Sequence, residues 1–219
     1  MKEELKLTNA QTNSRIASAA MLVGGLILFG SGPARADDAE KPVREVAGRT
    51  LQQHAERLDD SERTVRLRAL RSLAPFGAPA ADAIARCLGH EDAAMRYVAA
   101  VSLGDLGSDA VSKSKSGLER LIGDERSLAV QTAAAYALCQ SDREEDLQKY
   151  LPVLIEGLNH PERGMACGTA ELIGKLGPKA VAAASELEKV YASNRPGGKG
   201  DYHIGGAAKN ALRKLGAIN

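Results

Sequence analysis

The chain has 219 residues, a length that suits one solenoid domain. Aromatic residues make up only 3% of it and Trp is absent, which argues against a globular core built on large rings and favours helices packed through Ala and Leu. The net charge is +1, and it becomes −1 without residues 1–36, which hold four basic and two acidic residues. This near-neutral balance argues against a nucleic-acid-binding function.

The N-terminus has the pattern of an export signal. Residues 1–15 are polar and end at Arg15, and an apolar run over residues 16–29 follows. This run is shorter than the roughly 20 residues of a membrane-spanning helix. Ala34-x-Ala36 then fits the rule for signal-peptide cleavage. We expect residues 1–36 to be a signal peptide cleaved after Ala36, which makes the protein periplasmic or secreted. The alternative is an uncleaved segment that anchors the protein to a membrane.

Residues 37–41 form a charged linker, and a repeat domain is predicted over residues 42–219. Helix-like patterns of apolar residues alternate with turns along this domain. In chain order, the predicted first helices of successive pairs cover residues 42–58, 79–88, 110–122, 144–158 and 178–194. The predicted second helices end at Phe76 in the first pair and then cover residues 92–106, 126–139, 162–176 and 202–215.

One motif recurs on the five second helices, and we call it the repeat frame. Its copies start 30 to 39 residues apart, a spacing typical of stacked helical hairpins. A single hairpin cannot bury its apolar face, so the hairpins are expected to stack into one continuous core. The clearest copies are Val65-Arg66-x-x-Ala69-x-x-x-Leu73-x-x-Phe76-Gly77, Met95-Arg96-x-x-Ala99-x-x-x-Leu103-x-x-Leu106-Gly107 and Met165-x-x-x-Thr169-x-x-x-Ile173-x-x-Leu176-Gly177, and the weaker ones begin at Val130 and Ile204.

The repeat frame resembles HEAT repeats, and its short spacing is similar to that of the HEAT-like repeats of phycobilisome lyases. The resemblance implies an all-α, right-handed α-solenoid of about five HEAT-like helical hairpins. It also implies that Arg66 and Arg96 reach the acidic turn of a neighbouring repeat. The third and fourth copies depart from the family pattern, with Gln131 and Ala166 in place of this arginine. The family mostly binds proteins and rarely catalyses.

Side chains on the second helices that point away from the first helices form the predicted partner-binding stripe. They stand two and six positions after the first apolar residue of each copy. The stripe is apolar and aromatic between charged ends, a composition that suits an interface. The alternative is that its tyrosines only complete the packing between repeats. The predicted partner-binding residues are Leu67, Arg71, Tyr97, Val101, Thr132, Tyr136 and Glu171, with Cys167 on the same stripe.

The sequence gives no pattern for a metal or cofactor site. His90-Glu91 resembles the His-Glu pairs of deoxyhypusine hydroxylase, a HEAT-repeat enzyme that carries four such pairs, but this chain has one pair, placed in a turn. Its three cysteines are an odd number, and we expect all three to be free thiols. We therefore expect no cofactor and no metal.

The sequence predicts a non-enzymatic protein-binding scaffold in the cell envelope, which docks a protein or peptide segment on the concave face of the solenoid. Two alternatives remain open at this point. The first is a chromophore or cofactor lyase, through the resemblance to phycobilisome lyases. The second is a structural envelope protein that self-associates.

Overall fold

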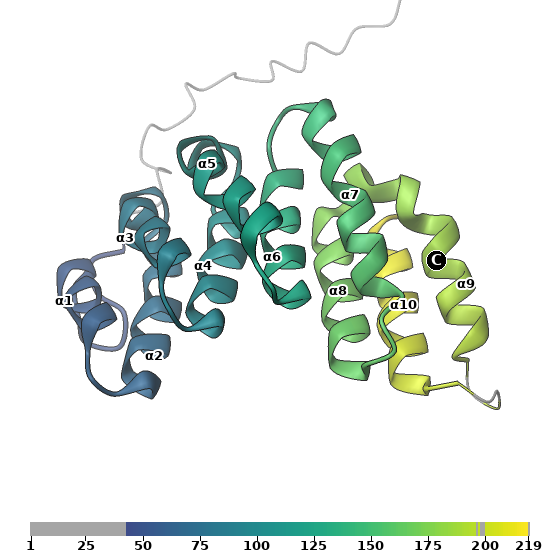
Figure 1. Cartoon of the computed structure of the whole chain (residues 1–219), viewed down its shortest axis with the longest axis horizontal. Helices are drawn as coiled ribbons and strands as arrows, with labels where there is room; N and C mark the ends of the chain where they lie inside the picture. Colours follow the sequence, from purple (N-terminus) through teal and green to yellow (C-terminus); the bar gives the residue numbers. More distant parts are fainter. Residues whose placement is uncertain (1–42, 196, 198–199, 219) are drawn as a thin grey trace, which may run out of the picture. The chain divides into compact units, whose positions relative to one another are not determined.

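The computed structural model describes residues 43–195, 197 and 200–218. The predicted signal peptide and linker lie outside the described residues. Within them, ten α-helices form an all-α fold of five stacked pairs (Figure 1). The predicted fold class is therefore confirmed. No helix in the described part of the chain is both long and apolar enough to cross a membrane.

Each pair contributes one helix to an outer row and one to an inner row (Figure 1). The outer row consists of α1 (Leu51–Glu56), α3 (Ala81–Arg86), α5 (Ser108–Asp124), α7 (Glu144–Leu158) and α9 (Ala184–Ser193). The inner row consists of α2 (Arg63–Leu73), α4 (Ala93–Asp105), α6 (Leu128–Cys139), α8 (Arg163–Leu176) and α10 (Tyr202–Lys214). Short 3-10 turns extend several helices at Arg57–Asp59, Ala74–Phe76, Ala78–Ala80, Cys87–Gly89 and Gly177–Ala183.

The first helix is shorter than the sequence pattern predicted. It begins at Leu51 rather than at residue 42, because Thr50 caps it with a reciprocal bond to Gln53. The preceding chain makes a tight turn closed by two hydrogen bonds between Val46 and Arg49. His54 is buried beneath this turn, and its Nε2 lies 2.9 Å from the Val46 carbonyl oxygen.

The core consists mainly of Ala and Leu, as the composition indicated, and it reaches its greatest depth around α6. Every residue of α6 from Thr132 to Cys139 is buried. Close approach of α4 to α6 depends on Gly104, because a Cβ there would lie 2.7 Å from Cε1 of Tyr136. Small side chains thus replace aromatic rings as the means of dense packing.

Arginine–carboxylate pairs join the turns of neighbouring repeats at three junctions. Arg96 Nε lies 2.6 Å from Glu125 Oε2, which confirms the inter-repeat role expected for Arg96. The same role expected for Arg66 is wrong: its Nη1 donates only to the Asp60 and Ser61 carbonyl oxygens of its own turn, and its Nε, the atom through which Arg96 pairs, has no hydrogen-bond partner. The other two of these three junctions are joined by different arginines, in the pairs Arg63–Asp92 (first to second repeat) and Arg163–Asp201 (fourth to fifth repeat).

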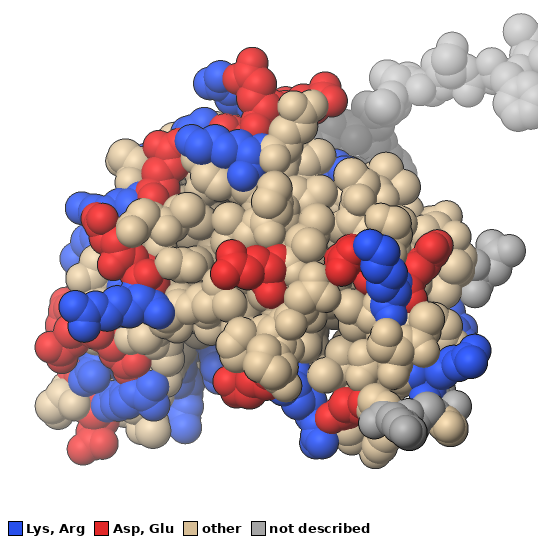
Figure 2. Space-filling view, turned by 45° about the vertical axis from the view of Figure 1, so that its right-hand side comes forward, with Lys and Arg blue, Asp and Glu red and all other residues tan. Residues whose placement is uncertain are grey.

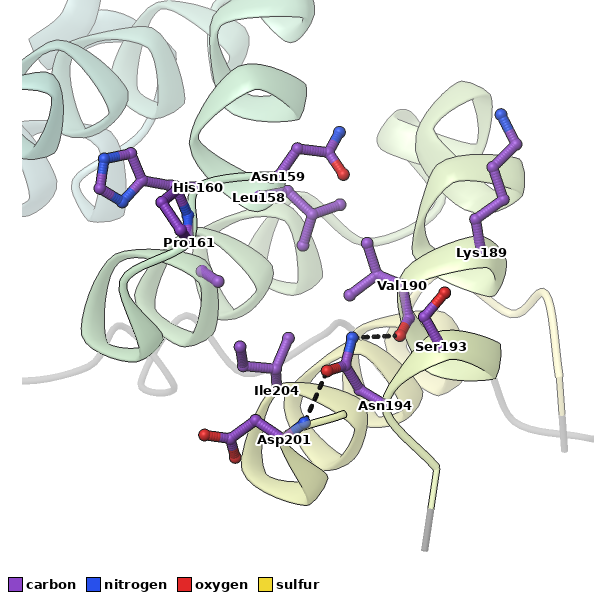
Figure 3. A pocket seen from close by; sticks show the side chains of 11 residues that line it. Leu158, Asn159, His160, Pro161, Lys189, Val190, Ser193, Asn194, Asp201 and Ile204 are labelled. Atoms are coloured by element: carbon purple, nitrogen blue, oxygen red, sulfur yellow. Dashed lines mark hydrogen bonds between the residues drawn. The ribbon is translucent and has the colours of Figure 1, made fainter. Parts of the chain in front are cut away.

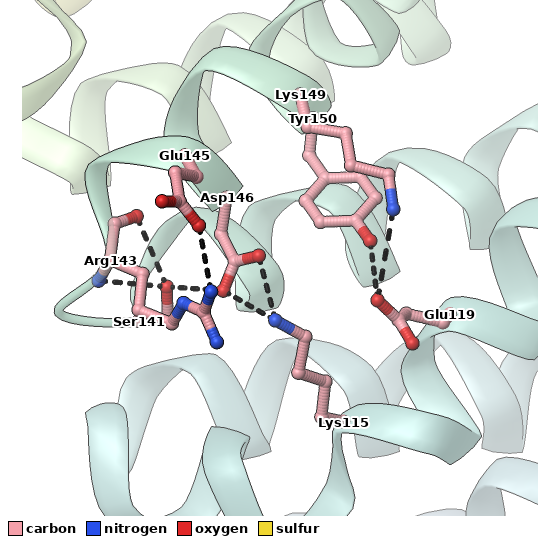
Figure 4. A network of polar contacts seen from close by, with 8 residues as sticks. All are labelled: Lys115, Glu119, Ser141, Arg143, Glu145, Asp146, Lys149 and Tyr150. Atoms are coloured by element: carbon pink, nitrogen blue, oxygen red, sulfur yellow. Dashed lines mark hydrogen bonds and ion pairs between the residues drawn. The ribbon is translucent and has the colours of Figure 1, made fainter.

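A polar network joins the outer helices α5 and α7 (Figure 4). Lys115 Nζ lies 2.7 Å from Oδ1 of the buried Asp146, and Ser141 Oγ donates to the other carboxylate oxygen at 2.9 Å. One helical turn further along, the Tyr150 hydroxyl donates to Glu119 at 2.8 Å. These bonds fix the third pair of helices against the fourth on the outer side of the stack.

Candidate functional site: a groove between α6 and α8

An apolar groove of about 400 Å³ lies where the N-terminal halves of α6 and α8 meet, and Tyr97 of α4 forms part of its wall. This volume falls within the range of protein sites that bind small molecules or side chains of a partner. We call it the α6–α8 groove. Its lining consists of Ala93, Ala94, Tyr97, Ser127, Ala129, Val130, Thr132, Glu162, Gly164, Met165, Gly168, Thr169 and Leu172.

Two glycines on α8 open the groove. Gly164 and Gly168 lie one helical turn apart on the same face, and a Cβ built at Gly168 would meet no atom within 4 Å. Other repeats carry side chains at both positions of the frame. The residues equivalent to Gly164 are Thr64, Ala94, Ala129 and His203, and those equivalent to Gly168 are Arg68, Val98, Ala133 and Ala207.

The groove also lies at the junction that lacks a turn-to-turn ion pair. Such pairs join the first repeat to the second, the second to the third and the fourth to the fifth. Between the third and fourth repeats, no ion pair joins the turns among the described residues. The polar cross-links between these two repeats lie instead between the outer helices, where Lys115 pairs with Asp146 and the Tyr150 hydroxyl donates to Glu119. The groove lies at this turn end, between the N-terminal halves of α6 and α8.

A buried hydroxyl without a partner lies in the groove lining. Thr169 is 1% exposed, and its Oγ1 forms no hydrogen bond in the structure. By contrast, the Thr132 hydroxyl donates to the Ala129 carbonyl oxygen at 2.9 Å. The other four copies of the frame have alanine at the position of Thr169, namely Ala69, Ala99, Ala134 and Ala208. A buried hydroxyl with no bond costs about 1–3 kcal/mol, so this threonine is unfavourable for packing alone.

Carboxylates border the groove. Glu162 belongs to its lining, and Glu171 lies on the α8 face that holds Gly164 and Gly168, one turn further along. Burial raises the pKa of the Tyr97 phenol, and the charges of Glu171 and Asp105 raise it further. The groove is therefore apolar inside and negatively charged at its rim.

The structure places the predicted partner-binding residues in three different environments. Tyr97 and Thr132 line the groove. Tyr136 is 1% exposed, because its ring packs beneath α4 and its hydroxyl donates to Asp105 at 2.6 Å. The expected exposure of Tyr136 and Thr132 on an open stripe therefore differs from the structure, where α6 is buried. Leu67, Val101 and Cys167 are half-buried, whereas Arg71 and Glu171 are exposed.

Most of the groove lining was missed by sequence reasoning. Gly164, Gly168, Thr169, Met165 and Leu172 were not among the predicted binding residues. The signal that could have identified three of them is their departure from the repeat frame, where other copies hold larger side chains or alanine. The predicted stripe used the same two positions in every copy of the frame. The groove instead forms where the fourth copy has residues that differ from those of the other copies.

A second hollow of about 400 Å³ lies between the α7–α8 turn and the end of α9 (Figure 3). Its central polar side chain, Asn194, is fully engaged. Asn194 Nδ2 donates to the Val190 carbonyl oxygen at 2.8 Å, and its Oδ1 accepts from the Asp201 backbone N–H at 2.8 Å. These bonds close the last repeat, so we assign this hollow a structural role.

Charge is spread without a dominant sign on the face drawn in Figure 2, where basic and acidic side chains lie interspersed among uncharged ones. Nucleic-acid-binding proteins instead gather basic residues on one face. Within the described residues, no group of three or more His, Cys, Asp or Glu side chains is arranged to hold a metal ion. The three cysteines are described, and all are free, as expected.

The thiols are held in their protonated form. Burial raises the pKa of Cys87 to about 11 and that of Cys139 to about 12, and it also raises the pKa of Cys167. Since the thiolate is the nucleophile, these three side chains are poorly suited to attack a substrate or a chromophore near neutral pH.

Comparison with known proteins supports the repeat assignment. The family model of HEAT repeats matches residues 51–139. No curated protein matches the sequence. The complex of CpcE and CpcF of phycocyanin lyase from Nostoc sp. PCC7120 includes a chain that is 21% identical, with a TM-score of 0.49, over 82% of this chain and 70% of that one. Two engineered proteins of the Northeast Structural Genomics Consortium are each 18% identical with TM-scores of 0.44, over 76% and 77% of this chain and 79% and 82% of theirs.

The family match confirms the predicted HEAT repeats over the segment that holds the first three copies of the frame. Helical repeats of this kind stack into extended surfaces that bind other proteins. This general property suggests a protein-interaction scaffold.

Proposed function

We propose that this protein is a non-enzymatic protein-binding scaffold that docks a peptide segment of its partner in the α6–α8 groove. The observation that carries the proposal is the groove itself, an apolar hollow opened by Gly164 and Gly168 whose lining includes Thr169, a residue with an unpaired hydroxyl. A partner segment that inserts an apolar side chain would cover the half-buried side chains of Tyr97, Ala129 and Met165. Burial of apolar area is the main source of affinity in such anchors.

The proposal of a non-enzymatic role rests on the chemistry of the described side chains. Catalysis by nucleophile or base requires a group whose pKa suits the reaction, held within reach of a second group. The groove lining has one carboxylate, Glu162, and no histidine or cysteine. The buried thiols elsewhere have raised pKa values, which is unfavourable for the lyase alternative as far as it depends on a reactive cysteine.

We further propose that the scaffold acts in the cell envelope, as a mature domain that begins after Ala36. The support is the order of polar segment, apolar run and Ala34-x-Ala36 in the sequence. N-terminal sequencing of the purified protein tests this part. A start at Asp37 is expected, and a start at Met1 would favour the membrane-anchored alternative.

A pair of glycine substitutions tests the docking site. Gly168→Leu places a side chain in the groove, where a Cβ meets no atom within 4 Å. Gly206→Leu is the control, because it places the same side chain at an exposed position of α10, outside the groove, where a Cβ also meets no atom within 4 Å. Both changes should raise helix stability by about 0.5–1 kcal/mol. Tagged forms are used to capture partners from a native envelope extract, with identification by mass spectrometry.

A partner captured by the wild type and by Gly206→Leu, and lost with Gly168→Leu, is the expected result. Capture of the same proteins by all three forms would place binding outside the groove. Large assemblies of the purified protein in light scattering would favour the self-associating alternative.

A further inference from the structure

We propose that the segment docked in the α6–α8 groove has an apolar anchor flanked by Lys or Arg, which pair with Glu162 and Glu171. This inference rests on the proposed docking function and specifies the chemistry of the partner.

The two carboxylates lie at the rim without partners of their own. Glu162 and Glu171 are exposed, and neither forms an ion pair with another residue that the structure describes. Glu162 precedes the first turn of α8 and lines the groove, while Glu171 follows Gly168 on the same helical face. A segment lying along α8 over the two glycines would pass between these carboxylates.

Of three cations near the groove in the sequence, two are paired elsewhere and the third lies at another hollow. Arg163, beside Glu162 in the sequence, pairs with Asp201 of the next repeat. Lys175, one turn after Glu171, pairs with Asp105 at 2.7 Å. Arg126 lies next to the lining residue Ser127 in the sequence, but it borders a different hollow, together with Arg96 and Glu125. The rim therefore presents negative charge that the protein itself does not neutralise.

Apolar walls and a charged rim have separate effects on binding. Burial of the anchor supplies most of the affinity, whereas complementary charge at the rim selects the partner and accelerates association. Exposed charges are also screened by salt, with a Debye length of about 10 Å at 0.1 M ionic strength. A preference for basic flanking residues should thus be strong at low salt and weak at high salt.

The test is selection of a displayed library of random dodecapeptides on the mature protein, with removal of peptides that also bind Gly168→Leu. We expect the selected peptides to hold an apolar residue with Lys or Arg within two positions, enriched at least about threefold over the starting library. The expected effect corresponds to roughly 0.6 kcal/mol, within the range of exposed ion pairs. Repetition of the selection at high salt should reduce this enrichment.

Matched variants assign the effect to the rim. Glu162→Gln with Glu171→Gln should abolish the basic preference and retain the apolar one. Glu156→Gln with Glu188→Gln changes the net charge equally at two exposed positions outside the groove, and it should leave the preference intact.

The outcomes separate the two proposals. Apolar peptides enriched without basic residues would overturn the inference and leave groove docking supported. A basic preference that persists in Glu162→Gln/Glu171→Gln would also overturn it. If the wild type enriches no peptide over Gly168→Leu, the docking function itself fails.

Discussion

Lys175 on α8 pairs with Asp105 at the end of α4, with 2.7 Å between Nζ and Oδ2, although α6 stands between these two helices in the inner row. The same carboxylate accepts a hydrogen bond from the hydroxyl of Tyr136 on α6 at 2.6 Å. Lys175 Nζ lies 5.7 Å from the centroid of the Tyr136 ring. Three successive repeats are thus joined through one aspartate. This cluster closes the C-terminal ends of α4, α6 and α8, whereas the groove opens near the N-terminal ends of α6 and α8.

Tyr136 should therefore contribute to stability rather than to binding. Tyr136→Phe loses the bond that the hydroxyl donates to Asp105 and the longer bond that it accepts from Gln140 Nε2 at 3.2 Å. Since water can reach the Asp105 carboxylate, we expect a loss of about 1 kcal/mol in the free energy of unfolding. Tyr136→Ala also creates a cavity at a position 1% exposed, and we expect a loss of about 3–5 kcal/mol. Urea unfolding of both variants measures these values. Equal losses would show that the ring contributes little to packing.

Tyr97 should behave in the opposite way. It is half-buried, lines the groove and forms no hydrogen bond with another described residue. Tyr97→Ala should lower the unfolding free energy by less than about 2 kcal/mol, because the ring is only partly enclosed. The selected peptides should nevertheless bind the Tyr97→Ala variant at least about tenfold more weakly than the wild type. Calorimetry measures this affinity, with Tyr136→Phe as the control. A large loss of stability with unchanged binding would instead support the packing role considered for this tyrosine.

The same substitution at two helical glycines should change stability in opposite directions. Gly104→Ala forces a Cβ to within 2.7 Å of the Tyr136 ring and 3.0 Å of the Ala137 Cα, so α4 and α6 must move apart. We expect it to cost about 1–3 kcal/mol. Gly168→Ala meets open space in the groove and should stabilise the protein by about 0.5–1 kcal/mol through helix propensity. Thermal unfolding of both variants checks the signs, and a destabilised Gly168→Ala would mean that the groove is closed in solution.

The spacing of apolar residues and the types of the residues between them were sufficient to predict the helical pairs from the sequence. Eight of the ten helices lie within about three residues of their predicted ranges, because apolar spacing and Gly or Pro breakers determine them locally. One exception is α9, which begins at Ala184 rather than at residue 178, because a 3-10 turn over Gly177–Ala183 precedes it. The other is α1, where apolar residues from Val43 onward continued a helical pattern that the Thr50 cap and the turn at Val46 interrupt. Periodicity cannot detect such a turn, since Val46 contacts His54 through its backbone oxygen.

The site was less predictable, for a physical reason. A repeat frame gives the direction of each side chain on its own helix, but exposure depends on how closely the next helix packs. Tyr97 and Tyr136 occupy stripe positions of the frame, yet the first lines the groove and the second is buried. The difference arises from Gly104, which admits α4 against the Tyr136 ring, and from Gly168, which leaves space beside α6. Distances between helices of this kind are not encoded in any single repeat.

Two neighbouring lysine pairs on the outer side should differ strongly in their contribution. Lys115 pairs at 2.7 Å with Asp146, whose side chain is 7% exposed, whereas Lys149 lies 3.8 Å from Glu119 and both side chains are largely exposed (Figure 4). Lys115→Met leaves a buried carboxylate without its cation, and we expect a loss of about 2–3 kcal/mol. Lys149→Met should cost no more than about 0.5 kcal/mol. Similar losses in urea unfolding would show that water solvates Asp146.

Stability should fall in alkaline solution because of the buried thiols. Burial raises the pKa of Cys139 from 9.0 to about 12 and that of Cys87 to about 11. Above pH 9 the unfolded chain loses thiol protons that the folded chain keeps, so stability is fully present below pH 9 and declines as pH rises towards these raised values. Each thiol contributes at most about 1.4 kcal/mol per pH unit. Unfolding midpoints of Cys139→Ala should decline less steeply between pH 9 and 10.5 than those of the wild type, and parallel declines would contradict this assignment.

Thr169→Val tests how the unpaired hydroxyl affects two quantities, the free energy of unfolding and the affinity for a docked peptide. Valine keeps the shape of threonine and removes Oγ1, which lies buried without a hydrogen bond beside α7. We expect the unoccupied protein to become more stable by about 1 kcal/mol, because a buried polar group is no longer left unsatisfied. If a docked segment supplies the missing partner, the same change should weaken peptide binding. Thermal unfolding and calorimetry on one preparation measure both effects, with Thr132→Val as the control that loses a bonded hydroxyl. A destabilised Thr169→Val would show that the hydroxyl already has a partner, and a stabilised variant with unchanged peptide binding would mean that the docked segment leaves Oγ1 unpaired.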